Sequence, residues 1–215
     1  MKTLFGSWLL LSLAGTLNAG APKPESKIQV FVYNYAGVAP ETLARAEREA
    51  ARIYSHTSIE TEWLDCPLTA DQAAQNPACQ LPESSTPLVL RVLSRGMSEQ
   101  LGLSQETFGS ALLPEDGGFG TVAQICAPCS EDLAKGNTAM HAAILGHLMA
   151  HELGHLLLGA GSHGATGLMH VPWHKKALES VAQGTLVFTP WEGERMRQQV
   201  FARQRGQESM QVSRN

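Results

Sequence analysis

The chain has 215 residues, of which 43% are hydrophobic and 17% are charged, a mixture typical of a globular protein rather than a disordered or fibrous one. This length suits a single domain with an apolar core of its own. The formal net charge of −4 argues against a general nucleic-acid binder and against a polybasic membrane-binding patch. We therefore expect neither a nucleic acid nor a membrane surface as a partner.

The first 20 residues have the layout of a secretory signal peptide. Lys2 gives a short positive start, residues 4–17 are mostly apolar or small, and small residues follow at Ala19 and Ala21. The apolar run is short for a helix that crosses a bilayer. We expect an exported protein, secreted or periplasmic, with a signal peptide over residues 1–20, a single folded domain over 21–206 and a frayed tail over 207–215.

Four cysteines in an exported chain predict two disulfides. Of the possible pairings we favour Cys66–Cys79 and Cys126–Cys129, because each closes a local loop. The second pair belongs to a Cys-Ala-Pro-Cys motif that follows a strand-like run, as in thioredoxin-like redox proteins. Nothing upstream places this motif at the first strand-to-helix turn of such a fold, so we expect a structural disulfide.

The N-terminal half of the chain predicts an α/β layout. Residues 27–35 are rich in β-branched and aromatic residues and indicate a strand. Pro40 suits the first turn of a helix whose later apolar positions keep helical spacing. Those positions are Leu43, Ala46, Ala50, Ile53 and Tyr54. Further strands are expected at 58–64, 87–93 and 107–113, and an edge strand at 121–125. Residues 66–86 are expected to form a long loop closed by a disulfide.

The strongest helical signal covers residues 138–158. Asn137 is a plausible N-cap, and the glycines Gly159 and Gly161 end the run. Four histidines and Glu152 lie inside it, which makes a membrane-spanning helix costly. We expect a core helix with one functional face, then a short helix from Pro172 to about Ala182 and a C-terminal helix that begins at a capping box, Thr189 to Glu192.

The motif with the clearest chemical meaning is His-Glu-Leu-Gly-His at residues 151–155. Side chains four residues apart on a helix project in nearly the same direction, so His151 and His155 can present two imidazoles to one metal ion. Glu152 projects in an adjacent direction and can reach a water molecule at the metal. This separation of roles is typical of zinc hydrolases. The alternative is a set of histidines that only pack in the core.

A catalytic zinc site usually needs a third protein ligand. His163 is the best-placed candidate, because the glycines at 159 and 161 let the chain leave the helix and turn back. His147 lies one turn before His151, and we expect it to pack or hydrogen-bond behind the ligands. Other candidates for the third ligand stay open: His170, His174, Glu179, Glu192 and Glu194.

Residues 151–169 resemble the metzincin clan of zinc endopeptidases, whose signature is HExxHxxGxxH followed by a methionine turn. The resemblance implies Zn²⁺ as cofactor and a peptide or protein as substrate. It also implies an α/β, zincin-like fold: a mixed, mostly parallel sheet with an antiparallel edge strand, packed on the active-site helix, and a small helical C-terminal subdomain. The residues it implies are His151, His155 and His163 as zinc ligands, Glu152 as general base and Met169 as the methionine beneath the metal.

The sequence departs from that signature in the loop after the helix. Gly159 is one place late and His163 two places late. His170 stands where many metzincins carry tyrosine, and from its place after Met169 we hypothesise that it stabilises an oxyanion. The loop that joins the helix to the third ligand therefore differs from that of the family.

We expect zinc-assisted amide hydrolysis by a monomer, with Glu152 taking a proton from water and passing it to the departing amine. The substrate would extend along an edge strand at Gly120 to Ala123. A side-chain pocket is expected from Phe119, Trp173, Leu186 and Phe188. Two other functions stay open: a non-catalytic exported zinc-binding protein of the same fold, and a thiol–disulfide protein that uses Cys126 and Cys129.

Overall fold

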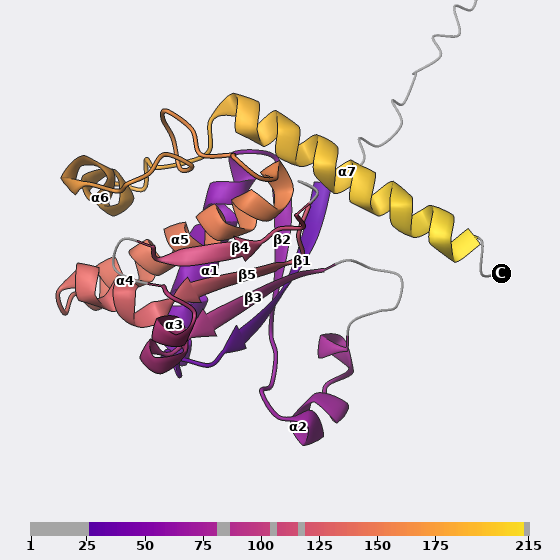
Figure 1. Ribbon diagram of the computed structural model, residues 1–215, viewed down its shortest axis with the longest axis horizontal. Coiled ribbons are helices and arrows are strands. Elements are labelled where there is room, and N and C mark those ends of the chain that lie inside the picture. Colours follow the sequence, from indigo (N-terminus) through magenta and orange to yellow (C-terminus); the bar gives the residue numbers. More distant parts are fainter. Residues whose placement is uncertain (1–25, 81–86, 104–106, 116–118, 213–215) are drawn as a thin grey trace, which may run out of the picture.

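The computed structural model describes residues 26–80, 87–103, 107–115 and 119–212, and the expected signal peptide lies outside these ranges. Five strands form one sheet in the order β2-β1-β3-β5-β4 (Figure 1). The first four in this order run parallel, and β4 is antiparallel to β5. This sheet confirms the expected fold class. The strands are β1 (Ser26–Asn34), β2 (Ile59–Asp65), β3 (Leu88–Leu93), β4 (Gly109–Leu112) and β5 (Val122–Cys126).

The expectation of an edge strand at 121–125 is wrong. Strand β5 lies inside the sheet, between β3 and β4, and β4 forms the edge. Ala123 and Ile125 of β5 are fully buried. The reason is topological: β4 precedes β5 in the chain and pairs antiparallel on its outer side, which places β5 between two neighbours.

Two helices supply most of the apolar core against one face of the sheet, α1 (Pro40–Ser55) and α5 (Thr138–Leu158). The apolar positions predicted for α1 are its buried residues, which confirms that amphipathic pattern. The two helices approach closely at Gly146, where an added Cβ would lie 2.5 Å from the Ala46 carbonyl oxygen. The Tyr54 hydroxyl also donates to the Ala150 carbonyl at 3.1 Å. Helix α5 is therefore held rigidly against α1.

Helix α5 begins and ends where the sequence predicts. The Asn137 side chain accepts a hydrogen bond from the Met140 amide at 3.0 Å and so caps the first turn. At the other end Gly159 has a φ of 86°, a left-handed conformation that favours glycine. The chain thus leaves the helix directly after the turn that carries His155.

Both favoured disulfides are present, Cys66–Cys79 and Cys126–Cys129. The first closes the segment after β2, which contains two short helices that the loop prediction missed. The second lies at the start of α4, where Cys126 is the N-cap. The remaining helices are α2 (Ala70–Ala74), η1 (Pro77–Cys79), α3 (Arg95–Gln100), α4 (Ala127–Ala134), α6 (Lys175–Ala182) and α7 (Pro190–Val212).

Helix α7 lies across the end of the sheet and of α5 (Figure 1). It begins at the predicted capping box, in which the Thr189 amide donates to Glu192 at 2.7 Å and the Glu192 amide donates to Thr189 at 3.3 Å. Arg203 donates to the Leu156 carbonyl at 2.8 Å and so ties α7 to the end of α5. The helix runs to Val212, farther than we expected.

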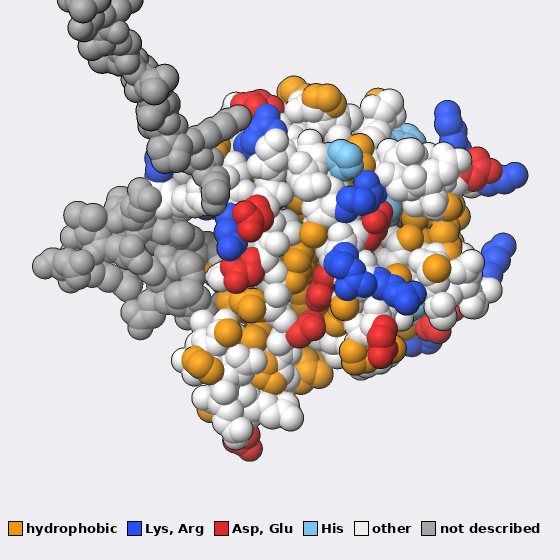
Figure 2. All heavy atoms as spheres, turned by 180° about the vertical axis from the view of Figure 1, so that it is seen from behind, with side chains coloured by type: hydrophobic (Ala, Val, Ile, Leu, Met, Phe, Trp, Pro, Cys, Tyr) orange, Lys and Arg blue, Asp and Glu red, His pale blue; other side chains and the backbone are white. Residues whose placement is uncertain are grey.

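The surface on the side opposite to the view of Figure 1 mixes charges of both signs. Figure 2 shows blue and red side chains interspersed with orange ones on that face. The ion pair between Arg52 and Glu49 of α1, at 2.7 Å, is an example of such pairing in the molecule. Among the described residues, no helix combines the length and apolar character that crossing a membrane requires.

The contact between α1 and α5 predicts that Gly146→Ala destabilises the protein. The added methyl group meets the Ala46 carbonyl at 2.5 Å and the Glu49 Cβ at 2.8 Å, so the helices must move apart. We expect a loss of about 1–3 kcal/mol in the free energy of unfolding, measured by urea denaturation. Gly96→Ala in α3 is the control, because nothing lies within 4 Å of its added Cβ. Equal stability of the two variants would contradict this packing.

The carboxyl of Glu47 on α1 predicts a pH-dependent stability. Burial, together with the neighbouring Asp65 carboxylate, raises its pKa from 4.5 to about 8. The raised pKa means that the folded state binds the proton of this carboxyl more tightly than the unfolded state does. Proton binding therefore stabilises the protein, and this stabilisation is complete below about pH 4.5 and is lost as pH rises toward 8.

We therefore expect Glu47→Gln to stabilise the protein at pH 9 by about 1–2 kcal/mol relative to wild type, with allowance for solvent screening, and to leave stability at pH 4 unchanged. Urea denaturation at both pH values measures the difference. Asp65→Asn is the matched control and reduces the pH dependence without removing Glu47. A wild type and a Glu47→Gln variant that respond identically to pH would refute the interpretation.

Candidate metal centre

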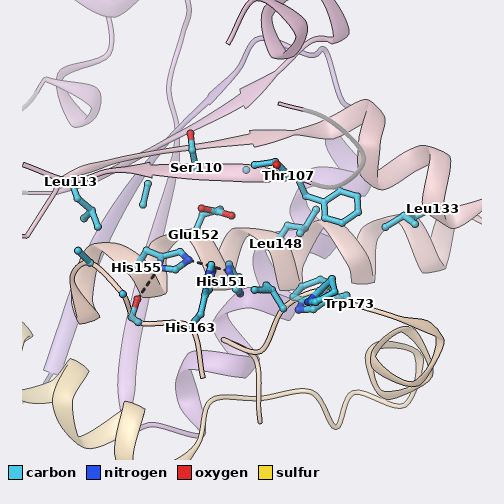
Figure 3. A pocket seen from close by; sticks show the side chains of 18 of the residues that line it. Thr107, Ser110, Leu113, Leu133, Leu148, His151, Glu152, His155, His163 and Trp173 are labelled. Atoms are coloured by element: carbon cyan, nitrogen blue, oxygen red, sulfur yellow. Dashed lines mark hydrogen bonds between the residues drawn. The ribbon is translucent and has the colours of Figure 1, made fainter. Parts of the chain in front are cut away.

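Three histidines converge at the C-terminal part of α5 (Figure 3). The Nε2 atoms of His151 and His155 lie 3.1 Å apart. His163 comes from the loop after α5, and its ring centroid lies 4.7 Å from that of His155 and 5.5 Å from that of His151. One nitrogen of each ring lies within 4.8 Å of the others, so the three can hold one metal ion. They are the one such group among the described residues.

The backbone and the following loop orient the two helical ligands. Nδ1 of His151 donates to the Leu168 carbonyl at 2.9 Å. Nδ1 of His155 lies 2.8 Å from the Ser162 hydroxyl. Both contacts leave the Nε2 atom of each ring directed toward the shared point, the position between the three histidines where one ion can bind. This is the usual arrangement around a protein-bound metal.

Burial keeps the two helical histidines neutral. It lowers the pKa of His151 from 6.5 to about 4, against the opposing effect of the bond to the Leu168 carbonyl. Burial also lowers the pKa of His155 to about 3, with further effects from the neighbouring rings of His151 and His163. A metal ligand must be neutral imidazole, so both rings are in the binding form at neutral pH. A set of three imidazole nitrogen donors fits the ligand preference of Zn²⁺.

Met169 lies directly against the helical turn between the two ligands. It is fully buried, and an added Cβ at Gly154 would meet its sulfur at 3.0 Å. The same added Cβ would lie 2.9 Å from the Phe188 ring. The chain segment after the third histidine thus returns beneath the site, where the family resemblance puts its methionine.

Glu152 is buried beside the triad, with 6% of its surface exposed. Burial raises the pKa of its carboxyl from 4.5 to about 8. Its side chain lies against Gly109 of β4: an added Cβ there would be 2.6 Å from the Cγ of Glu152. Sequence reasoning missed Gly109, since a glycine in a short strand signals close backbone approach without showing to what.

The other histidines near the motif do not join the triad. His147 is fully buried, donates from Nδ1 to the Ala143 carbonyl at 2.7 Å and meets the Trp173 ring edge-on at 6.4 Å. His170 is exposed, and its Nδ1 donates to the Gly164 carbonyl at 3.2 Å. It is not among the residues that line the cavity, so its position does not support a role at an oxyanion.

The remaining candidates for a third ligand lie outside the triad. His174 lines the cavity but is not part of the histidine group. Glu192 belongs to the capping box of α7, and Glu194 pairs with Arg197. Glu179 lies on α6, 3.9 Å from Lys175.

A cavity of about 910 Å³ contains the triad and Glu152. Residues 107–111 of the β4 segment line one wall, so the sheet edge that borders the site is β4 and the expected edge at Gly120 to Ala123 is wrong. Figure 3 shows Leu133, Leu148 and Trp173 on one side of the histidines and Leu113 on the other.

Of the four pocket residues predicted from the sequence, Trp173 alone lines this cavity. Phe188 is buried in the core below Gly154, and Leu186 packs against the same core. Phe119 is 42% exposed at the surface. Phe108, Leu133 and Leu148 complete the apolar wall instead. Leu148 lies on α5 itself, whereas Phe108 and Leu133 come from segments whose proximity to the motif depends on tertiary structure.

No protein-family model and no curated protein matches this sequence. Among solved structures, the zinc-dependent peptidase from Methanocorpusculum labreanum matches with a TM-score of 0.50 and 13% identity, over 78% of this chain and 99% of that one. The archaemetzincin from Methanopyrus kandleri has a TM-score of 0.49 and 15% identity, over 84% and 99%. The match to the first of these structures shows a shared fold. The chain therefore has the fold of a zinc-dependent peptidase, as the resemblance implied, and three of its histidines are placed beside Glu152 where they can hold one metal ion.

Proposed function

We propose that this protein is an exported zinc-dependent endopeptidase that acts as a monomer on peptide or protein substrates. The observation that carries the proposal is the convergence of His151, His155 and His163 beside a buried carboxyl, inside a cavity bordered by a sheet edge. Both cysteine pairs form disulfides, which suits a protein that works in an oxidising compartment.

The three histidines would hold the metal through one nitrogen each and leave a position open toward the cavity. A bound zinc ion lowers the pKa of water and polarises a substrate carbonyl. His151 and His155 contribute by remaining neutral and fixed in orientation. His151 and Glu152 are buried, and electrostatic effects between buried groups are stronger than in bulk water.

Glu152 acts as the proton carrier in this proposal. Its carboxylate takes a proton from the attacking water and delivers it to the departing amine. Burial raises its pKa to about 8, so the carboxyl holds the transferred proton firmly at neutral pH. A cation at the triad would favour the ionised form and so prepare the base for the first transfer.

Strand β4 is the surface along which we place the substrate. It is an edge strand of the sheet, and its residues Gly109, Ser110 and Ala111 line the cavity. An extended peptide can add to such an edge through backbone hydrogen bonds. The apolar wall, which includes Leu133 and Trp173, then accommodates an apolar substrate side chain.

The other two functions receive less support from the structure. A purely structural metal site has no use for a buried carboxyl at Glu152, whose burial costs free energy. For a thiol–disulfide protein, Cys126 and Cys129 are too well shielded, with 1% and 5% of their surfaces exposed. A reactive cysteine has to be accessible to its partner.

Glu152→Gln tests the role of the base. The amide cannot carry the proton, so we expect the hydrolytic rate to fall by about 10²- to 10⁴-fold while the zinc content stays that of the wild type. Hydrolysis of a fluorogenic peptide library and metal analysis of the purified protein measure the two quantities. Glu179→Gln on the exposed face of α6 is the control. A Glu152→Gln enzyme with full rate and full zinc would sink the proposal.

Gly109→Ala tests whether β4 sets the position of Glu152. The added methyl group would lie 2.6 Å from Cγ of Glu152 and 2.7 Å from the Gln124 carbonyl, so both the carboxyl and the strand must shift. A misplacement of a catalytic group by about 1 Å can cost about 10²-fold in rate. We therefore expect kcat/KM to fall by about that factor with zinc retained.

The shorter side chain of Glu152→Asp relieves this clash, so the double variant should lose less relative to Glu152→Asp alone than Gly109→Ala loses relative to wild type. Steady-state kinetics on the four proteins complete the cycle. Strictly additive losses would mean that Gly109 acts independently of the carboxyl.

A further inference from the structure

Ser162 lies in the loop between α5 and His163, and its hydroxyl contacts one of the metal-site histidines. The Oγ of Ser162 is 2.8 Å from Nδ1 of His155. Nε2 of the same ring lies 3.1 Å from Nε2 of His151, so the ring turns this nitrogen toward the shared point. When Nε2 is the metal-binding atom, Nδ1 carries the proton and donates it to Ser162. The contact therefore selects the orientation in which His155 can bind.

The two helical ligands differ in what holds them. His151 donates to the backbone carbonyl of Leu168, which any residue at that position would supply. His155 is held by a side chain, so its orientation depends on the residue type at position 162. A substitution can therefore remove the second contact and leave the first in place.

The same loop carries the ligand that the fold shields least. His163 is exposed, whereas His151 is buried and His155 is half-buried. Its neighbours hold it on both sides: Ser162 bonds to His155, and the Gly164 amide donates to the Met169 carbonyl at 3.0 Å. The bond to Ser162 ties the loop to α5 directly beside the third ligand.

The path of this loop is one that a hydrogen bond can help to fix. The chain leaves α5 through Gly159 and turns again at Gly161, both with positive φ. Glycine permits this path but also leaves the unfolded loop more freedom to lose. The third histidine comes two places later than in the metzincin signature, and a longer loop has more conformational freedom for an anchoring bond to remove.

We propose that Ser162 is a positioning residue of the metal site: its hydroxyl fixes the ring of His155 and holds His163 within reach of the same ion. The inference rests on the proposed function, because it assumes that the triad binds zinc. Ser162 acts through the two histidines and does not itself touch the metal or the substrate.

The test compares Ser162→Thr with Ser162→Val, two variants of the same shape that differ in the hydroxyl. We expect the Thr variant to bind zinc as wild type does. The Val variant should bind about 10- to 100-fold more weakly, the usual cost of losing an outer hydrogen bond to a ligand. Competition with a chromophoric chelator measures the affinity, and the visible spectrum of the Co²⁺-loaded protein reports the geometry of the ligands.

Thr166→Ala is the matched control, because it removes a hydroxyl from an exposed residue of the same loop and should leave zinc affinity unchanged. Melting temperatures of the metal-free proteins establish that each variant folds, and Ser162→Ala replaces the Val variant if that one does not. Equal affinities for Thr and Val, whether both strong or both weak, would overturn the role of the hydroxyl. Failure of the wild type to bind zinc is a different result, which removes the proposed function itself.

Discussion

Helix α5 keeps polar side chains out of water, and the surrounding structure is built around this constraint. His151 is 4% exposed and Glu152 6% exposed. Such burial costs free energy unless hydrogen bonds or opposite charge replace the lost hydration. The Leu168 carbonyl replaces it for His151. For Glu152 the dominant effect is burial, which raises its pKa to about 8, and a cation at the triad is the group that would stabilise its ionised form.

Three glycines set how closely the neighbouring elements approach this helix. Gly146 lets α1 come within contact of α5, and Gly154 leaves room for Met169 and Phe188 beneath the histidines. On the opposite side Gly109 of β4 makes room for Glu152. An added Cβ at each would lie 3.0 Å or less from a neighbouring atom. The site is therefore positioned by close packing on several sides, which suits a group of residues that must hold a fixed geometry.

Local features of the sequence were sufficient for α5, its Asn137 cap, the histidine spacing and both disulfides, because each depends on residues close together in the chain. The position of β5 was not predictable in this way, since the order of strands depends on pairing between distant segments. The same holds for the apolar wall of the cavity: Leu133 comes from α4 and Phe108 precedes β4. The contact between Gly109 and Glu152 likewise exists only once the sheet has formed.

X-ray absorption at the zinc edge on the purified, folded protein would show whether the three histidines bind zinc, because it reports both the identity of the metal and its ligands. We expect stoichiometric zinc with about three imidazole nitrogens at about 2.0–2.1 Å and about one further light atom. A protein that retains no zinc after equilibration with the ion, or zinc whose ligands include no imidazole, would contradict it.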